Sequence, residues 1–251
     1  MNIYLAFAII AVVSYLVGNI NFSRIVSKYI YKKDLSTMGS GNPGTMNVLR
    51  NLGFVAALIT LLAEVVKAGL CCLISRICMS STGYGELAFF VAGFFTVFGG
   101  MYPLFYNFKG GKGIAAMGGM FLFSRLWWVG LIMFAIGVIQ IIITDMGVVS
   151  SMIFIFGMSA AITTWAFLSH VPYAWLITVI VWVLTALSVF KHRGNLNRLI
   201  HGKENGSNFK KAFKKLISRH KPVETIEEDE VEAAPEAEIV IEDNEETDKK
   251  N

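Results

Sequence analysis

Charged residues are scarce in this 251-residue chain, and acidic residues are almost missing from most of it. Only 16% of the residues are charged and 55% are apolar, with a mean hydropathy of +0.57. This composition excludes an ordinary soluble enzyme. Positions 224–248 hold 13 of the 18 Asp and Glu residues, so residues 1–222 carry 20 basic and only five acidic side chains. The sequence predicts a basic, membrane-embedded body with an acidic tail.

Three further absences narrow the possible chemistry. The cysteines Cys71, Cys72 and Cys78 lie in one apolar segment without paired spacing or a nearby histidine, which supports neither a disulfide framework nor a zinc site. No internal repeat is found, although many transporters have one. The N-terminus lacks the basic start and cleavage site of a removable signal peptide, so we expect it to remain as a helix.

The apolar segments predict an all-α, polytopic membrane protein with about seven transmembrane helices. A spanning helix needs about 20 mostly apolar residues. Six segments approach or exceed that length: 3–20, 53–79, 87–108, 126–143, 147–168 and 171–190. A seventh, 114–123, is short and contains two central glycines, and it spans only as part of a longer helix that starts near Gly113.

The distribution of basic residues predicts the orientation of these helices. Short loops rich in Lys and Arg stay on the cytoplasmic side. The first segment is followed by Arg24, Lys28, Lys32 and Lys33, which predicts an N-terminus outside and a first loop inside. Seven spans then place the C-terminus inside.

Two segments follow the last apolar stretch. Residues 1–205 form the expected membrane domain. Residues 206–221 combine aromatic and aliphatic residues at helical spacing with lysines, which predicts a basic helix on the anionic membrane surface; a solvated basic linker is the alternative. Residues 222–251 are acidic and contain no aromatic residue, so we expect disorder there.

The first candidate functional motif is Gly39-Ser40-Gly41-Asn42-Pro43-Gly44, followed by Asn47 and Arg50. Glycines let the backbone approach a ligand closely, and successive amides can converge on an anion. The motif matches G-x-G-x-x-G, but no strand precedes it and no βαβ unit follows, so the match does not indicate a dinucleotide site. We expect an anion-binding loop, and a plain surface turn is the alternative.

The second motif is Lys109-Gly110-Gly111-Lys112-Gly113, between two apolar segments. Two ammonium groups around paired glycines form a compact cationic cradle suited to phosphate. It is not a Walker A loop, because Gly113 stands where Ser or Thr is required. The alternative is a flexible hinge between two lysines that anchor the membrane boundary.

The third motif runs from His192 to Arg198 as His-Arg-Gly-Asn-Leu-Asn-Arg and is followed by Gly202-Lys203-Glu204. A histidine exchanges protons near neutral pH, and arginines hold phosphate through paired hydrogen bonds. The alternative is a basic patch that binds lipid headgroups. Separately, Glu64 and Lys67 lie three residues apart inside the second span, where we favour a structural ion pair over a substrate contact.

In this order, the three motifs resemble those of the acyl-phosphate-dependent glycerol-3-phosphate acyltransferases of bacterial membranes, the PlsY type. The resemblance runs from Gly18 to Glu204. It implies a seven-helix protein that moves a fatty acyl group from acyl phosphate to the 1-hydroxyl of glycerol 3-phosphate, giving lysophosphatidic acid and inorganic phosphate. It implies membrane lipid as a partner, and no metal, cofactor or nucleic acid.

The resemblance also assigns site residues. We expect catalytic roles for His192, Lys112 and Asn195. We expect phosphate binding by Gly39, Ser40, Gly41, Asn42, Asn47, Lys109, Gly110, Gly111, Gly113, Arg193 and Arg198. Glu64, Lys67 and Glu204 are further candidates. The proton of the acceptor hydroxyl passes either to His192 or to the departing phosphate.

Several positions depart from the family pattern. Gly18-Asn19-Ile20-Asn21 replaces Gly-Ser-Ile-Pro, and Asp145 stands where the family has an arginine. Two alternative functions therefore accompany the acyltransferase hypothesis: a non-catalytic paralog that binds phospholipid or phosphate, and a transporter of a phosphorylated solute. The coenzyme-A-dependent class is excluded because no histidine is followed by Asp in the His-x4-Asp pattern.

Overall fold

The computed structural model describes residues 2–204 and 206–218, and all regular secondary structure in this part of the chain is helical. The expected disordered tail and the last three residues of the expected basic segment lie outside the described residues. The longer helices are α1 (Ile3–Gly18), α4 (Phe54–Cys78), α5 (Gly85–Met101), α7 (Trp127–Thr144), α8 (Gly147–Leu168) and α9 (Ala174–Lys191). The shorter ones are α2 (Phe22–Ile25), α3 (Thr45–Leu52), α6 (Ile114–Leu122), α10 (Arg193–Ile200) and α11 (Phe209–Ser218).

Four short turns of other helical types complete the chain. They are η1 (Val26–Ile30), which is a π-helical turn, and the 3-10 turns η2 (Leu35–Thr37), η3 (Ser80–Thr82) and η4 (Leu104–Tyr106). Among the described residues, six segments are long and apolar enough to cross a membrane: Ile3–Ile30, Phe54–Cys78, Gly85–Tyr106, Trp127–Thr144, Gly147–Leu168 and Ala174–Lys191. These six correspond to the six full-length segments that the sequence predicts.

The seventh expected span is the short helix α6. Its nine residues rise about 14 Å, less than half of the hydrocarbon thickness. The middle of α6 is buried, and a Cβ added at Gly119 would overlap the carbonyl oxygen of Val65 on α4. Glycine is therefore required where the backbones of α4 and α6 meet. This helix is an internal packing element, and its length alone does not carry it across a bilayer.

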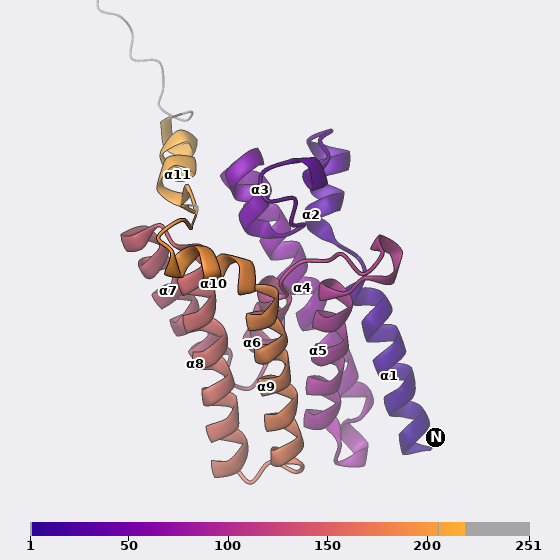
Figure 1. Ribbon diagram of the computed structural model, residues 1–251. Coiled ribbons are helices and arrows are strands. Elements are labelled where there is room, and N and C mark those ends of the chain that lie inside the picture. Colours follow the sequence, from indigo (N-terminus) through magenta and orange to yellow (C-terminus); the bar gives the residue numbers. More distant parts are fainter. Residues whose placement is uncertain (1, 205, 219–251) are drawn as a thin grey trace, which may run out of the picture. The chain divides into compact units, whose positions relative to one another are not determined.

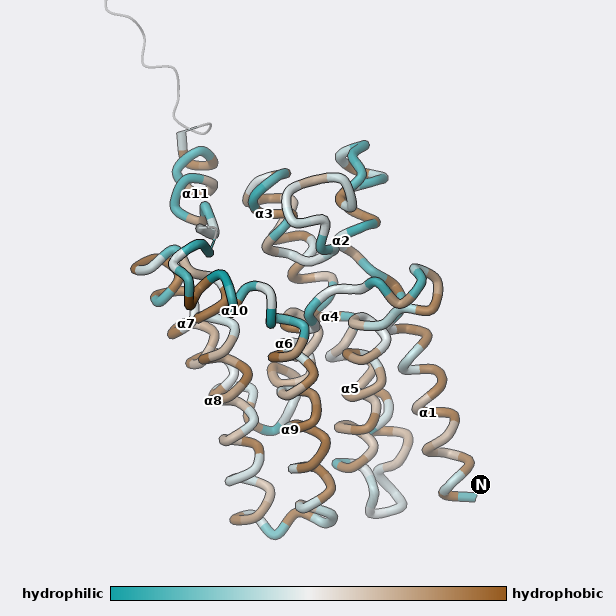
Figure 2. Tube along the Cα trace, viewed as in Figure 1, coloured by the Kyte–Doolittle hydropathy of each residue, from teal (hydrophilic) through white to brown (hydrophobic). Residues whose placement is uncertain are grey.

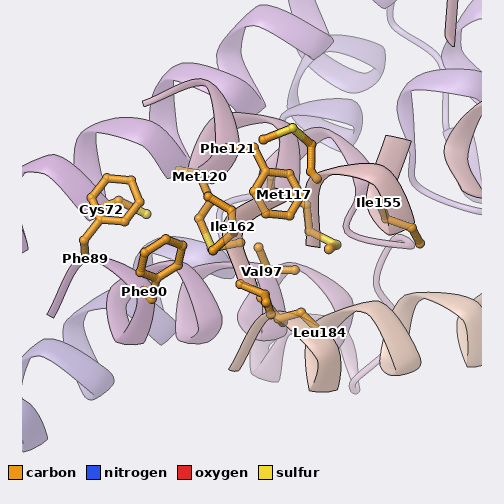
Figure 3. Packing of buried hydrophobic residues seen from close by; sticks show 14 of the residues in the cluster. Cys72, Phe89, Phe90, Val97, Met117, Met120, Phe121, Ile155, Ile162 and Leu184 are labelled. Atoms are coloured by element: carbon orange, nitrogen blue, oxygen red, sulfur yellow. The ribbon is translucent and has the colours of Figure 1, made fainter. Parts of the chain in front are cut away.

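Helix α5 is the centre of the bundle, since it packs against α1, α4, α6 and α9 (Figure 1). Helix α8 packs between α7 and α9. Aromatic residues and methionines fill the space between these helices, including Phe89, Phe90, Met117 and Met120 (Figure 3). The outward faces of α1, α4 and α7 instead expose leucine, isoleucine and valine, a distribution that fits lipid as the surrounding solvent.

A break separates α1 from α2, and two charged residues of α4 bind backbone groups that the break leaves free. The carboxylate of Glu64 accepts a hydrogen bond from the backbone N–H of Phe22, at 2.9 Å. The ammonium of Lys67 donates to the carbonyl of Ile20, at 2.6 Å, and to Glu64, at 2.7 Å. Free backbone groups inside a membrane need such partners. The ion pair therefore has a structural task, as the sequence favours.

The hydrophilic segments gather at one end of the bundle (Figure 2). There, α3 packs on the start of α4, and α10 follows directly from α9. Helix α11 forms within the segment predicted to be helical, and it contacts α3, α4 and α7. Its Phe209 and Phe213 rings pack on the Phe54 ring, with centroids 5.8 and 5.5 Å away. Part of its apolar face is thus used within the protein.

Candidate functional site

A chain of hydrogen bonds joins the second and third motifs at the hydrophilic end of the bundle. The Lys112 ammonium donates to the side-chain oxygen of Asn195. The Asn195 amide donates to Glu204, at 2.6 Å, and Arg198 donates to the other oxygen of Glu204, at 3.0 Å. The Glu204 side chain is only 2% exposed. Four polar side chains from two distant motifs therefore form one connected unit.

The first motif delivers a third cation, Arg50, to this unit. Arg50 lies on α3, and its Nε donates to the carbonyl of Gly206, at 2.9 Å. Burial lowers the pKa of Arg50, while the neighbouring Glu204 raises it and Arg198 lowers it. Arg50 is therefore near enough to Glu204, Arg198 and Asp145 for their charges to shift its pKa. Three cations, Lys112, Arg50 and Arg198, thus act together with two carboxylates, Glu204 and Asp145, and positive charge is in excess.

Burial changes the titration of Lys112. The pKa of the Lys112 ammonium is lowered from 10.5 to about 8, chiefly by burial; the Glu204 charge opposes this shift, and the Arg198 and Arg50 charges add to it. At neutral pH the lysine is still mostly protonated. An additional anion between the cations would be stabilised, because it would relieve their mutual repulsion.

His192 is buried behind Lys112 at the end of α9. Its Nδ1 lies 2.8 Å from the carbonyl oxygen of Ser188, and the Ser188 hydroxyl donates to the carbonyl of Lys112, at 3.0 Å. A carbonyl only accepts, so Nδ1 carries the hydrogen and Nε2 is the basic nitrogen. Burial and the Lys112 charge lower the pKa of His192 to about 4. The imidazole is therefore neutral at physiological pH.

The glycines of the first two motifs let two loops approach closely. A Cβ added at Gly111 would lie 3.1 Å from the carbonyl oxygen of Pro43, which also accepts from the Asn21 amide, at 3.3 Å. A Cβ at Gly110 would overlap the carbonyl oxygen of Gly100. Gly113 has a φ of +81°, which favours glycine. These glycines act by allowing contact between backbones.

The first motif uses its own polar groups internally. Gly39 and Gly41 have φ values of +56° and +66°. The Asn47 side chain accepts from the backbone N–H of Ser40, at 3.2 Å, and donates to the carbonyl of Met38, at 2.9 Å. The amides of Gly41 and Asn42 are also engaged inside the loop. The amides thus hold the loop in shape, and the group that the motif brings to the charged unit is Arg50.

Four further expected site residues lie away from this unit, in addition to those of the first motif. The Arg193 guanidinium folds back over the Phe190 ring, 4.4 Å from its centroid, and donates to the Phe190 carbonyl. Lys109 is exposed, and its carbonyl accepts from Arg24, at 3.1 Å. Glu64 and Lys67 complete the helix break described above. Within the described part of the chain, none of these four forms a hydrogen bond or ion pair with Lys112 or Asn195.

The segment after Glu204 is fastened to the same end of the bundle. The Asp145 side chain accepts from the Ser207 hydroxyl, and the Asp145 carbonyl accepts from the Ser207 amide, at 2.7 Å. Gly206, between Ser207 and the charged unit, accepts from Arg50. Asp145, which departs from the family pattern, therefore holds the segment that leads into α11.

Sequence reasoning missed the parts played by four residues of the site. Arg50 was noticed only as a neighbour of the first motif. Ser188 was not singled out, although a hydroxyl one turn before His192 on the same helix was the available signal. Asn19 and Asn21 appeared only as departures, yet the Asn19 side chain accepts from the Leu104 amide and Asn21 holds Pro43. Asn19 and Asn21 thus connect the break between α1 and α2 to the segments that contain Leu104 and Pro43.

Comparison with known proteins identifies relatives across most of the chain. A family model described as glycerol-3-phosphate acyltransferase matches residues 8–202. The chain is 39% identical over 203 residues to a glycerol-3-phosphate acyltransferase of Finegoldia magna, covering 80% of this chain and 96% of the relative. It is 36% identical over 196 residues to that of Thermoanaerobacter pseudethanolicus, covering 77% and 92%.

Two solved structures have a similar fold. One is a crystal structure of PlsY (YgiH), an integral membrane glycerol 3-phosphate acyltransferase, in its glycerol 3-phosphate form. It gives a TM-score of 0.69 at 28% identity, covering 80% of this chain and 94% of that chain. The lysophosphatidic acid form of the same protein gives 0.66 at 26% identity, with the same coverage.

Proposed function

The chain belongs to the glycerol-3-phosphate acyltransferase family, and we propose that its acyl donor is an acyl phosphate and its reaction centre the unit around Lys112, Asn195 and Glu204. Membership makes it an acyltransferase that acts on glycerol 3-phosphate in phospholipid synthesis. The acyl donor, the membrane topology and the roles of individual residues are what we propose beyond family membership.

The observation that carries the proposal is the cation excess around Glu204. Lys112, Arg50 and Arg198 carry three positive charges against two carboxylates, Glu204 and Asp145. Arginine side chains suit phosphate because their donors are paired and planar, and a lysine adds a compact point charge. A donor phosphate and an acceptor phosphate bring the compensating charge. In this scheme Lys112 and Arg50 hold the donor phosphate and Arg198 holds the acceptor phosphate.

An acyl phosphate is already activated, so the protein mainly positions the reactants and stabilises charge. The oxygen of the glycerol 1-hydroxyl attacks the acyl carbonyl carbon. The bond from that carbon to the phosphate oxygen breaks, and inorganic phosphate leaves with the hydroxyl proton. His192 is a poor proton acceptor at a pKa of about 4. We assign it to positioning, through Ser188 and the Lys112 backbone.

The same proposal includes a topology. Seven helices cross or enter the bilayer when α6 is counted, with the N-terminus outside and the C-terminus in the cytoplasm of a bacterial cell. The cations of the three motifs lie at one end of the bundle, which the positive-inside rule assigns to the cytoplasm. Cysteine accessibility of Lys112→Cys and Arg193→Cys tests it, because both must label from the same side of the membrane.

The donor is tested with purified protein and radiolabelled glycerol 3-phosphate, offered palmitoyl phosphate, palmitoyl-coenzyme A or palmitoyl-acyl carrier protein in separate reactions. We expect labelled lysophosphatidic acid from palmitoyl phosphate alone. Lys112→Ala is expected to lower the rate at least about tenfold, since it removes a charge-assisted contact. Lys33→Ala is the matched control, because Lys33 is an exposed lysine outside the charged unit.

Other outcomes distinguish the remaining hypotheses. Product from one of the two thioesters, and none from palmitoyl phosphate, overturns the proposed donor while leaving the family activity intact. If no donor gives product under conditions in which a relative is active, the chain is a non-catalytic paralog. Uptake of labelled glycerol 3-phosphate into proteoliposomes without acylation identifies a transporter.

A further inference from the structure

The end of the bundle opposite the three motifs has very few cations. Helix α4 starts near the motifs at Phe54, and Arg76 lies 22 residues further on, about 33 Å along the helix axis. In the described chain, Arg76 and Arg125 are the only Lys or Arg in or beside the segments that join α4 to α5, α6 to α7 and α8 to α9. The two arginines come from different segments of the chain.

Both arginines converge on one carboxylate, Glu86 in the first turn of α5. The Nε of Arg125 donates to Glu86 Oε1, at 2.9 Å, and Arg76 Nη1 lies 3.6 Å from the same oxygen. Two guanidinium groups therefore share one negative charge. Arg76 Nη1 is shielded from solvent and has no hydrogen-bond acceptor within the described residues. Buried donors normally have an acceptor, so this group has unused capacity.

A hollow of about 480 Å³ opens beside this triad. It is lined by Arg76, Leu122, Phe123, Ser124, Arg125 and Trp127. Arg125 engages Glu86 through Nε only, and its side chain is 63% exposed, so its terminal amino groups are accessible. The hollow thus combines guanidinium donors with apolar walls, which suits a group that is anionic on one side and apolar on the other.

The level of the hollow in the membrane is marked by aromatic residues. Trp127 and Trp128 are exposed at the start of α7, and Trp175 is exposed at the start of α9. Tryptophans are enriched where the hydrocarbon layer meets the headgroups. A ligand in the hollow therefore sits at headgroup depth, within reach of a lipid in the adjacent leaflet.

We propose that this hollow binds the anionic phosphodiester headgroup of a membrane lipid, with Arg125 and Arg76 as the phosphate contacts and the apolar wall against the lipid's glycerol and acyl part. Glu86 holds the arginines in place and offsets only one of the two charges. The lipid occupies the leaflet opposite the motifs, so this site does not rest on the proposed reaction.

Native mass spectrometry of the detergent-solubilised full chain tests the proposal. The protein is titrated with phosphatidylglycerol, with phosphatidylcholine and with inorganic phosphate, and the bound fraction is measured. We expect phosphatidylglycerol to bind in preference to phosphatidylcholine. Arg125→Gln is expected to lower its bound fraction roughly threefold or more, as loss of one partly exposed charge contact does. Lys28→Gln, an exposed cation at the motif end, is the control and is expected to bind like wild type.

Glu86→Gln separates a lipid site from a purely structural ion-pair cluster. This variant keeps both arginines and removes the competing carboxylate, so we expect phosphatidylglycerol binding to be equal or stronger.

The proposal is overturned if Arg125→Gln binds like wild type, if Lys28→Gln loses as much binding, or if Glu86→Gln loses binding while its melting temperature is unchanged. Binding of inorganic phosphate without phosphatidylglycerol assigns the hollow to a free anion and overturns the lipid assignment. Acylation of glycerol 3-phosphate by Arg125→Gln is measured alongside, so failure at this site is distinguishable from failure of the proposed reaction.

Discussion

The Lys112 ammonium donates a hydrogen bond to the side-chain oxygen of Asn195, although 83 positions separate the two residues. The Asn195 amide nitrogen in turn donates to Glu204. An asparagine carries an acceptor and a donor on one side chain, so it can connect a cation to a carboxylate. Asn195 therefore joins the second motif to the third.

This relationship predicts that Asn195→Ala lowers kcat/KM by at least about tenfold, because it leaves a buried carboxylate and a half-buried ammonium without a shared partner. Asn197→Ala is the matched control, since Asn197 is exposed two positions further along α10. Steady-state kinetics with palmitoyl phosphate measures both. Equal rates in the two variants would remove Asn195 from the site.

The hydrogen bond between His192 Nδ1 and the Ser188 carbonyl predicts that two substitutions of His192 differ in activity. Asparagine can reproduce the Nδ1 hydrogen bond to the Ser188 carbonyl but cannot act as a base. If His192 positions the loop, His192→Asn retains about tenfold more activity than His192→Ala, the value of one such hydrogen bond in a buried site. Initial rates and melting temperatures of both variants are compared with wild type. Equally inactive variants with wild-type melting temperatures would instead support a proton-transfer role.

The lowered pKa of Lys112 predicts a pH dependence with a defined sign. With a pKa of about 8, the ammonium is charged at pH 7 and has lost most of its charge at pH 9. We therefore expect KM for the acyl phosphate to rise several-fold between these values, with a smaller change in kcat, because bound phosphate favours the charged lysine. Arginine stays charged throughout this range. A KM in Lys112→Arg that rises as steeply as in wild type would contradict the assignment.

The transmembrane helices were predictable because their signal is local: a run of apolar residues long enough to span a bilayer. The seventh span was not settled in this way, since α6 is only nine residues long and its burial depends on α4 and α5. Helical residues that pack around a glycine contact cannot be recognised from length. The placement of α6 therefore depends on how the neighbouring helices pack, and a single sequence does not specify that packing.

The site was predictable as a set of motifs but not as a set of contacts. Sequence spacing brings Lys112, Asn195 and Glu204 into one hypothesis, and the structure joins these three. The sequence spacing cannot show that Arg193 turns back onto the neighbouring Phe190 while Arg198 turns toward Glu204. Side-chain direction at a helix end depends on the packed neighbours. The approach of Arg50 depends likewise on how α3 sits against the segment at Gly206.

The crowding at Gly110 predicts a sharp difference between two glycine variants. A Cβ at Gly110 would overlap the backbone of Gly100, whereas a Cβ at Gly194 would make only an ordinary contact, 3.7 Å from Arg198. Gly110→Ala must therefore displace the loop that carries Lys112, and we expect it to lower both the melting temperature and kcat/KM. Gly194→Ala, on a helix, should keep or slightly raise the melting temperature. Wild-type kinetics in Gly110→Ala would show that the loop is not held where the structure has it.

The contact between Asp145 and Ser207 predicts the effect of restoring a cation at position 145. Sequence comparison with the family pattern alone suggests that Asp145→Arg raises turnover. In the structure, however, Asp145 accepts from the Ser207 side chain, and Gly206 is held by Arg50. An arginine at position 145 loses the contact with Ser207. Its positive charge also lies near Arg50, and the two positive charges repel each other.

We therefore expect Asp145→Arg to lower the melting temperature and to raise KM for the phosphate substrates. Ser207→Ala, which removes the hydroxyl alone, should have a smaller effect in the same direction. Kinetics, melting temperature and the protease sensitivity of residues 206–218 distinguish the two variants. If Asp145→Arg instead raises turnover with an unchanged melting temperature, the segment leading into α11 has no part in holding Arg50, and the lost family arginine is the stronger influence.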